Sequence, residues 1–291
     1  MIIFESDKFS EIYETILDKL LKNPKYKSSP RGQKIHETLN MGFKLENPLN
    51  CLYDNEKRSS QYKYIAAETI WYFMGDNTPN FISKYAKMWN EIKNKDNTIN
   101  SAYGYLVFND TSIINTTQWN WCLNSLLNDK DTRQAIMHFN NPTHQFIENK
   151  DFVCTMYAIF HIRDNKLNMT VHMRSQDVIL GLPTDLPFFI LLQQQLLNHL
   201  KTKYNDLELG TYTHIVDSLH LYERNFDLVN NMLQYDFINN SIPILNKNII
   251  NIEGKPEYDF IELSTSLDDI TYEYDKDNLY KWIYKNITHN K

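Results

Sequence analysis

The chain has 291 residues and a formal net charge of −6, and 42% of its side chains are hydrophobic and 13% aromatic. That apolar content excludes a disordered chain, and an acidic balance argues against a general nucleic-acid binder, which carries a basic excess. The length fits one large domain or two small ones. The three cysteines are too few and too unpatterned for a disulfide framework or a zinc site, so no metal is expected.

The beginning of the given sequence is not expected to act as a targeting signal. Residues 1–5 contain neither a basic region nor a long apolar run, so we expect no signal peptide, and no apolar stretch reaches the length of a membrane span. The many Asn, Lys, Ile and Tyr residues indicate an AT-rich genome, such as that of a phage, a large DNA virus or a low-GC bacterium. We therefore expect a cytoplasmic protein, or one in the host cytoplasm if the source is viral.

The first half of the chain is expected to be mainly helical. Apolar residues at helical spacing predict an amphipathic helix over 9–21. Further helices are expected over 65–74, 81–92 and 119–128, with polar loops over 23–32 and 94–100 and a strand over 133–139.

The second half begins with a predicted β-hairpin, whose strands cover 156–162 and 167–173 around a turn at 163–166. A strongly apolar helix over 186–200 is expected to be the central buried one. A strand from 214 and a β-rich segment over 242–252 follow. No internal repeat is visible. The mixture predicts an α+β fold, a single domain with helices packed on a mixed β-sheet.

The predicted hairpin has a chemical consequence. A hairpin returns its two ends to the same place, so Cys154 is expected to lie beside Arg174 and Ser175. A thiol beside a cation and a hydroxyl suits a nucleophile that attacks an anionic substrate. Taken alone, a single cysteine is more often a buried structural residue.

Three long motifs follow one another in this region: FVCT at 152–155, RSQDVILGLPTD at 174–185 and DSLHLY at 217–222. Together they resemble the core motifs of the thymidylate synthase and deoxycytidylate hydroxymethylase family, over about residues 28–228. The resemblance implies a thymidylate synthase-like α+β domain and a homodimer formed by sheet-to-sheet packing. It also implies a pyrimidine nucleoside monophosphate as substrate and 5,10-methylenetetrahydrofolate as co-substrate, with no requirement for a nucleic acid or a membrane.

The domain limits expected from this resemblance are a helical decoration over 1–27, a catalytic domain over 28–263 and a C-terminal extension over 264–291.

The resemblance implies three catalytic residues. Cys154 would add to C6 of the pyrimidine so that C5 can attack a one-carbon unit, and a nearby arginine is expected to lower the pKa of the thiol. Glu68 lies in an apolar helix, where its pKa should be raised, and it matches the glutamate that moves protons at the base ring. A polar residue at the edge of that helix is the alternative. Tyr103 resembles the active-site tyrosine near the cysteine.

Phosphate binding is implied for a second group. Arg174 matches a phosphate ligand, with Ser175 as a neutral donor, and Arg31 lies in a loop like the one that closes over the phosphate. Arg133 matches a position that reaches across the dimer to the partner's substrate. Many relatives carry a second arginine next to it, where this chain has Gln134. For each arginine, the alternative is a solvated surface charge.

Base and sugar recognition is implied for Asp185, His220 and Tyr222. Thymidylate synthases usually carry Asn at the position of Asp185, where its amide pairs with uracil. A carboxyl accepts from the cytosine amino group and, when protonated, donates to N3. Alternatively, Asp185 caps a helix that starts at Leu186. His220 and Tyr222, at i and i+2 of a strand, point to one face and suit a sugar hydroxyl. Asp217 stands where relatives often carry Gly.

The folate contacts implied are Asp177 for the pterin and Gly181 for a close turn under the cofactor. Trp89 falls where relatives place an aromatic ring beside the folate, and a core position is an equally good interpretation of it.

The same adduct leads to two products. Water addition gives a hydroxymethyl group, whereas hydride transfer gives a methyl group and needs a dry, closed site. Thymidylate synthases close theirs with a short apolar C-terminal segment, and the end of this chain, 284–291, is polar. With Asp185, this predicts conversion of dCMP to 5-hydroxymethyl-dCMP. The alternatives are a thymidylate synthase acting on dUMP, a dUMP hydroxymethylase, and a non-catalytic homologue that binds nucleotide or RNA.

Overall fold

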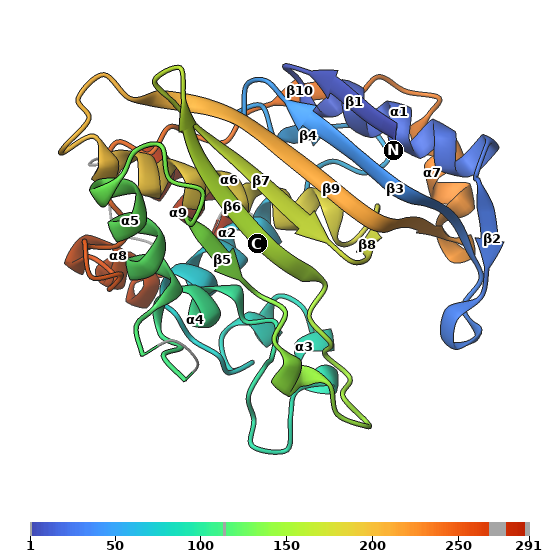
Figure 1. Ribbon diagram of the computed structural model, residues 1–291. Helices are drawn as coiled ribbons and strands as arrows, with labels where there is room; N and C mark the ends of the chain where they lie inside the picture. Colours follow the sequence, from blue (N-terminus) through green and yellow to red (C-terminus); the bar gives the residue numbers. More distant parts are fainter. Residues whose placement is uncertain (1, 113–114, 268–277, 289–291) are drawn as a thin grey trace.

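The protein is described here by a computed structural model covering residues 2–112, 115–267 and 278–288. One large sheet crosses the molecule, with helices behind it (Figure 1). Its strands are β1 (Ile2–Ser6), β2 (Tyr26–Ser28), β3 (Ile35–Leu45), β5 (Ile136–His138), β6 (Thr155–Arg163), β7 (Lys166–Met173), β8 (Gln176–Asp177) and β9 (Glu208–Tyr222). A small second sheet pairs β4 (Leu52–Asp54) with β10 (Ile238–Asn240).

The large sheet is mixed. Its strand order is β1-β3-β9-β7-β6-β5, with β2 beside β3 and β8 beside β9. The long strand β9 runs antiparallel to β3 but parallel to β7 and β8. This arrangement confirms the expected α+β class with a mixed sheet. Strand β8 follows β7 and pairs with the same neighbour, β9. The RSQD motif therefore lies beside the C-terminal end of β9, where Asp177 is opposite His220.

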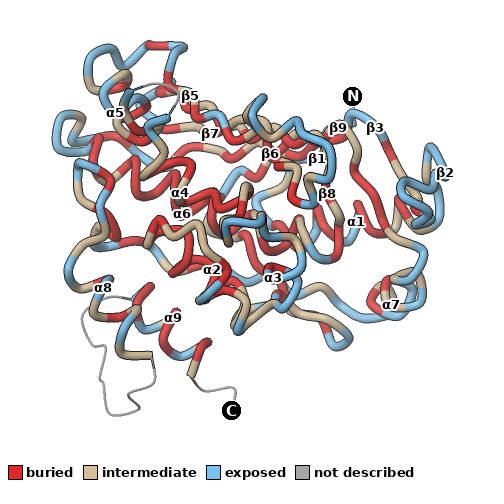
Figure 2. The backbone as a smooth tube through the Cα atoms, turned by 90° about the horizontal axis from the view of Figure 1, so that it is seen from below, coloured by how far each residue is buried: buried red, intermediate tan, exposed pale blue. Residues whose placement is uncertain are grey.

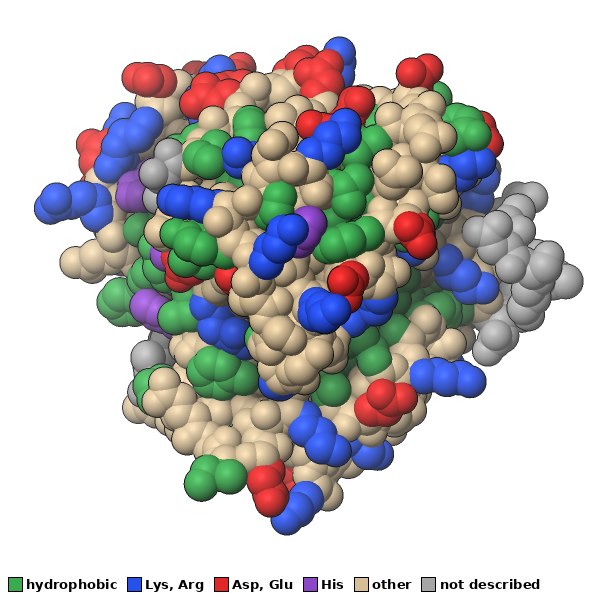
Figure 3. Space-filling view, turned by 90° about the vertical axis from the view of Figure 1, so that its right-hand side faces the viewer, with side chains coloured by type: hydrophobic (Ala, Val, Ile, Leu, Met, Phe, Trp, Pro, Cys, Tyr) green, Lys and Arg blue, Asp and Glu red, His purple; other side chains and the backbone are tan. Residues whose placement is uncertain are grey.

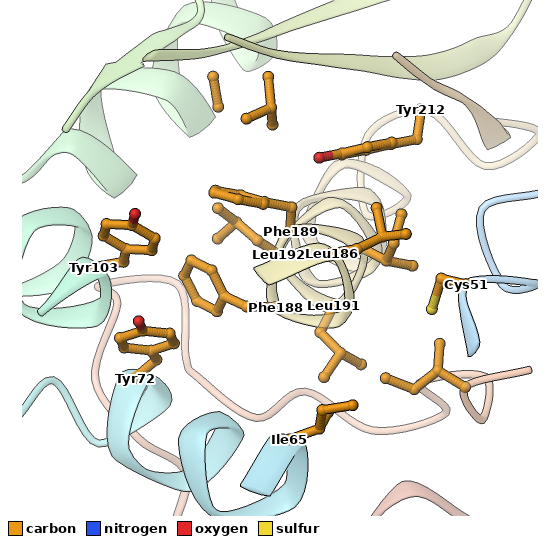
Figure 4. Packing of buried hydrophobic residues seen from close by; sticks show 14 of the residues in the cluster. Cys51, Ile65, Tyr72, Tyr103, Leu186, Phe188, Phe189, Leu191, Leu192 and Tyr212 are labelled. Atoms are coloured by element: carbon orange, nitrogen blue, oxygen red, sulfur yellow. The ribbon is translucent and has the colours of Figure 1, made fainter. Parts of the chain in front are cut away.

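The helices are α1 (Phe9–Lys22), α2 (Tyr62–Phe73), α3 (Met88–Ile92), α4 (Tyr103–Phe108), α5 (Gln118–Asn128), α6 (Leu182–Leu200), α7 (Phe226–Met232), α8 (Tyr258–Thr265) and α9 (Asn278–Thr288). Buried backbone is concentrated in α2, α4 and α6 (Figure 2). Around α6, the side chains of Phe188 and Leu191 point to different sides of the helix and pack among residues of neighbouring elements (Figure 4). An all-round apolar helix is therefore central, as its sequence predicted.

The predicted hairpin is confirmed. Strands β6 and β7 pair antiparallel from Arg163 and Lys166 back to Thr155 and Met173. The turn residues Asp164 and Asn165 have φ angles of 48° and 58°, as a tight turn with two left-handed residues requires. The helices expected over 9–21, 65–74 and 119–128 are confirmed within a few residues at each end.

The helix expected over 81–92 is wrong. The chain forms a single 3₁₀ turn at Ile82–Lys84 and then the short helix α3. The break lets the Trp89 ring pack 5.0 Å from that of Trp71 while its Nε1 donates to Tyr64 Oη at 3.1 Å. These tertiary contacts of Trp89 outweigh the helical preference of the local sequence, so the helix is interrupted.

Other element boundaries also differ from expectation. Residues 23–32, expected to be a loop, include the exposed strand β2. The helix expected from 186 starts at Leu182, where Pro183 suits the first turn, and the strand expected from 214 starts at Glu208.

No described part of 242–252 forms a strand beyond an isolated bridge at Ile250, so the β-rich prediction is wrong. Side-chain amides of α6 replace the sheet partner there: Gln194 Oε1 accepts from Leu245 N at 2.9 Å, and Gln195 Oε1 accepts from Ile249 N at 2.6 Å.

Both ends of the described chain pack on the central helices and sheet. In α1, Tyr13 is fully buried and its Oη donates to Val178 O at 2.8 Å, just before α6. Helix α9 lies against α2 and α8, with Leu279 and Ile283 buried. The domain limits at 27/28 and 263/264 stay predictions. Residues 268–277 and 289–291 of the expected C-terminal extension lie outside the described residues.

Candidate active site

The predicted site residues surround one cleft with a cavity volume of about 580 Å³. Its walls come from α2, α3, the open end of the hairpin, the first turn of α6 and the end of β9. The predicted residues that line it are Arg31, Glu68, Trp89, Tyr103, Cys154, Arg174, Ser175, Asp177, Gly181, Asp185, His220 and Tyr222. Arg133 does not line it, because it is exposed between α5 and β5.

Cys154 and Arg174 meet at the open end of the hairpin. Arg174 Nη2 lies 3.5 Å from Cys154 Sγ, its Nε donates to Val153 O at 3.0 Å, and its guanidinium sits 4.6 Å from the Phe152 ring centre. These contacts fix the cation beside the sulfur. Arg174 lowers the pKa of the Cys154 thiol, as expected, but burial raises this pKa by more, so the net pKa lies above its usual value.

Glu68 is 3% exposed, although it faces the cleft. Burial raises its pKa well above the usual range, and the nearby Asp185 adds to the rise. Tyr64 Oη donates to Glu68 Oε1 at 2.7 Å and itself accepts from Trp89 Nε1. A carboxyl held neutral in this way is able to exchange a proton with a bound base. It is not a polar residue at a helix edge.

Asp185 occupies the first turn of α6, and Gly181 is the residue before that helix, so the capping interpretation of Asp185 is wrong. Its Oδ2 accepts a hydrogen bond of 2.6 Å from Gln176 Nε2. Burial raises the pKa of Asp185 to about 7, with Asp177 adding to the rise and the Gln176 hydrogen bond opposing it. Near neutral pH, this group is therefore divided between the neutral acid and the carboxylate.

Tyr103 lines the cleft and contacts Thr155, the residue that follows the nucleophile. Its Oη accepts from Thr155 Oγ1 at 2.9 Å, and its ring stacks on Tyr72 at 5.4 Å between ring centres. His220 and Tyr222 do share a face of β9, because their rings meet edge to face at 5.1 Å.

The three expected folate residues line the side of the cleft nearest α3 and α6. Asp177 Oδ1 accepts from the backbone of Ile179 at 2.7 Å, so this carboxylate also closes its own turn. Gly181 has an ordinary negative φ of −85°. A Cβ there would lie 3.1 Å from both Asp177 O and Gln176 Nε2, which makes this glycine a matter of local crowding. Trp89 is buried, and it takes part in the Glu68 hydrogen-bond chain.

Sequence reasoning missed several cleft residues. Arg58 and Arg224 both line it, and the Arg224 guanidinium lies 3.9 Å from the centre of the Tyr222 ring. Arg224 lies two residues after the end of the third motif, which is a signal that could have found it. Gln176 lies inside the second motif, one residue before Asp177. Arg58 carries no such signal, because its distance to the motifs is set only by folding.

The cation distribution is local. Arg31 adopts a left-handed φ of 52° and lines both the main cleft and an adjoining hollow of about 730 Å³, together with Arg174 and Ser175. On the face shown in Figure 3, Lys and Arg side chains are scattered among acidic and uncharged ones. Four arginines and four carboxyl groups thus line one cleft of small-molecule size: Arg31, Arg58, Arg174 and Arg224, with Glu68, Asp151, Asp177 and Asp185. Within the described ranges, no helix has the length and apolarity needed to span a bilayer.

The sequence model of the family described as thymidylate synthase matches residues 11–273. The chain belongs to the thymidylate synthase family. The deoxycytidylate 5-hydroxymethyltransferase of Enterobacteria phage T4 is 30% identical over 223 residues, covering 72% of this chain and 84% of the phage protein. The deoxyuridylate hydroxymethyltransferase of Bacillus phage SP01 is 28% identical over 233 residues, covering 76% of this chain and 59% of that protein.

A solved structure with a similar fold also indicates the thymidylate synthase fold. Thermostable thymidylate synthase A from Bacillus subtilis superimposes with a TM-score of 0.64 at 20% identity, covering 79% of this chain and 86% of the other. The family resemblance expected from the three motifs is thereby confirmed.

Proposed function

We propose that this family member transfers a one-carbon unit to C5 of dCMP and releases 5-hydroxymethyl-dCMP. The observation that carries this is Asp185, a carboxyl with a pKa of about 7 in the wall of the cleft that holds Cys154. Thymidylate synthases usually carry Asn at this position. The relative from phage T4, named as a deoxycytidylate 5-hydroxymethyltransferase, supports the same substrate.

Base recognition follows from hydrogen-bond complementarity. Cytosine offers an acceptor at N3 and a donor at its 4-amino group. A neutral Asp185 donates to N3 and accepts from the amino group, so both edges are paired. A buried polar group left unpaired costs about 1–3 kcal/mol, which is enough to discriminate between bases.

Cys154 is the proposed nucleophile. The thiol first gives its proton to water in the cleft, and Arg174 at 3.5 Å stabilises the resulting thiolate. The thiolate then bonds to C6 of the base, and its negative charge passes to the pyrimidine ring. Glu68, held neutral by burial, is proposed to donate and accept the protons that the ring atoms exchange. A hydrogen bond from Thr155, the residue after Cys154, holds the hydroxyl of Tyr103 in place.

The substrate phosphate is assigned to Arg31, Arg174 and Ser175, which share the hollow beside the cleft, with His220 and Tyr222 next to the sugar. Arg133 is proposed to complete this site in a second copy of the chain. Support comes from the sheet face opposite α6, because none of the described helices lies in front of strands β6 and β9 in Figure 1. Apolar residues of these strands, such as Ile159 and Ile215, are only half-buried.

The proposed one-carbon donor, 5,10-methylenetetrahydrofolate, is a co-substrate. The cleft volume of about 580 Å³ is typical of a small-molecule site, and Asp177, Gly181 and Trp89 line the side proposed for the folate. It supplies the carbon that becomes the hydroxymethyl group. Half-exposed Leu180 at the rim offers an apolar contact for a flat ring.

Water access favours the hydroxymethyl product. No described residue of α9 lines the cleft, since this helix packs on the outer side of α2. Residues 289–291, at the end of the polar segment 284–291, lie outside the described residues. A cleft left open to solvent lets water compete with hydride transfer. The two phage relatives support a place in the cytoplasm of an infected host.

The deciding experiment is incubation with methylenetetrahydrofolate and either dCMP or dUMP, followed by the masses of both products. Hydroxymethyl-dCMP together with tetrahydrofolate is the expected result. Thymidylate with dihydrofolate would establish a thymidylate synthase instead, and hydroxymethyl-dUMP would establish a dUMP hydroxymethylase. Nucleotide binding with neither product would identify a non-catalytic homologue.

A further inference from the structure

A chain of buried hydrogen bonds runs from the cleft wall into the core behind Asp185. Gln176 Nε2 donates to Asp185 Oδ2 at 2.6 Å, Gln176 Oε1 lies 2.8 Å from His214 Nε2, and His214 Nδ1 lies 2.8 Å from Tyr212 Oη. Gln176 is 3% exposed, and both His214 and Tyr212 are fully buried. Nothing in the reaction proposed above uses these three side chains, yet every polar atom among them is paired.

The donors and acceptors of this chain are ordered. Burial lowers the pKa of His214 to about 3, so its ring is neutral and carries a single N–H. The amide oxygen of Gln176 can only accept, which places that proton on His214 Nε2. Tyr212 must then donate to the bare Nδ1. Reversing the Gln176 amide would require the other histidine tautomer and a turned tyrosine hydroxyl at the same time.

This order has a consequence for a neutral carboxyl. Such a group can present its O–H and its C=O in either order, and the two orders match different bases. Cytosine needs a donor opposite N3 and an acceptor opposite the 4-substituent, whereas uracil needs the reverse. Because Oδ2 of Asp185 accepts from Gln176, the acid proton is left to Oδ1.

We propose that Gln176, held by His214 and Tyr212, is a positioning residue that keeps the proton of Asp185 on Oδ1, opposite N3 of the base, and so confers preference for cytosine over uracil. This inference rests on the proposed recognition of dCMP by Asp185.

The test compares kcat/KM for dCMP and for dUMP in Gln176→Leu, Gln176→Glu and Tyr212→Phe. Gln176→Leu removes the N–H donor, and we expect the dCMP/dUMP ratio to fall about tenfold, mainly through a higher KM for dCMP. Gln176→Glu keeps an oxygen that accepts from His214. Its second oxygen faces Asp185 Oδ2, so one proton lies between these two oxygens and Asp185 Oδ1 is left without a proton. We therefore expect this variant to lower use of dCMP and raise use of dUMP, a pair of opposite changes that a general folding defect does not produce.

Gln193→Leu is the matched control. Gln193 is also a fully buried glutamine, but its Nε2 donates to Leu167 O at 2.8 Å and Thr211 O at 3.2 Å, away from Asp185. Its loss should lower the melting temperature and leave the dCMP/dUMP ratio unchanged. Tyr212→Phe removes a single hydroxyl and retains the ring, so it keeps the test open if the Gln176 variants do not fold, and we expect a smaller fall of the ratio in the same direction.

The outcomes separate the two proposals. If the unaltered protein uses dUMP in preference to dCMP, the proposed function itself is refuted. If the unaltered protein prefers dCMP but the folded Gln176 and Tyr212 variants keep the ratio within about twofold, which is below the size of one net hydrogen bond, the positioning role is refuted and the proposed function stands.

Discussion

Asp185→Asn is expected to remove the pH dependence that Asp185 gives to dCMP binding. In the unaltered protein, only the neutral form of Asp185 donates to N3 of cytosine, and the pKa of this carboxyl is about 7. An asparagine whose oxygen accepts from Gln176 in the place of Oδ2 presents a permanent N–H in the place of Oδ1. It is therefore a neutral mimic of the acid that does not titrate.

The magnitude follows from the titration. Above a pKa of about 7, the neutral fraction of Asp185 falls about tenfold for each unit of pH, so dCMP affinity should be similar in both proteins at pH 6 and about tenfold higher in the variant at pH 8. Glu68 and Cys154 line the same cleft, and the charge of Asp185 raises the pKa of both, so the variant also lowers these two pKa values. The tenfold figure is the part that comes from Asp185 alone.

The variant should also be more stable at alkaline pH. The folded pKa of Asp185 is raised from 3.8 to about 7, so the unaltered protein loses stability as pH rises through that window. The upper limit is about 4 kcal/mol, reduced because the carboxyl borders an open cleft. Asp185→Asn does not lose this stability. The difference in the free energy of unfolding between the variant and the unaltered protein should therefore grow between about pH 4 and about pH 7, the two pKa values of Asp185, and then level off.

The assay is calorimetric titration with dCMP between about pH 6 and pH 8.5, a range set about the expected pKa. Urea unfolding is measured separately between about pH 4 and pH 8, which covers the window of the stability change. Asp151→Asn is the control, because Asp151 is a buried carboxyl of the same cleft that accepts from Ser101 N at 2.7 Å. Equal pH slopes for dCMP affinity in Asp185→Asn and the unaltered protein would refute the idea that a neutral Asp185 binds the base.

Further outcomes are expected at other cleft positions. Cys154→Ser should lose turnover almost completely and keep dCMP binding; turnover that persists in rapid-quench assays would rule out the thiol adduct. Glu68→Gln should lower kcat about 100-fold or more, with little change in the dissociation constant of dCMP, because proton exchange is lost while the fold is kept. Arg133→Ala should be nearly inactive alone, yet an equimolar mixture with Cys154→Ser should recover about a quarter of full activity, since half of the dimers then hold one intact site. A mixture that stays inactive after subunit exchange would show that Arg133 serves its own chain.

Much of the site was already determined by short-range sequence pattern. Alternating residues and a turn with two left-handed positions specify the β6–β7 hairpin, and the hairpin in turn brings Cys154 to Arg174. The all-round apolar run after Asp185 specifies a buried helix. These features depend on neighbours along the chain, so a single sequence contains what is needed to predict them.

The remaining features depend on contacts between distant residues. Gln176 and His214 are 38 positions apart, and only the pairing of β8 with β9 makes them partners behind Asp185. The motif already indicated that Arg174 lies beside Cys154. The pKa of Cys154 is nevertheless raised, because folding removes water from the thiol. Burial, register and the direction of a hydrogen bond are properties of the assembled tertiary structure, and for that reason no local pattern determined them.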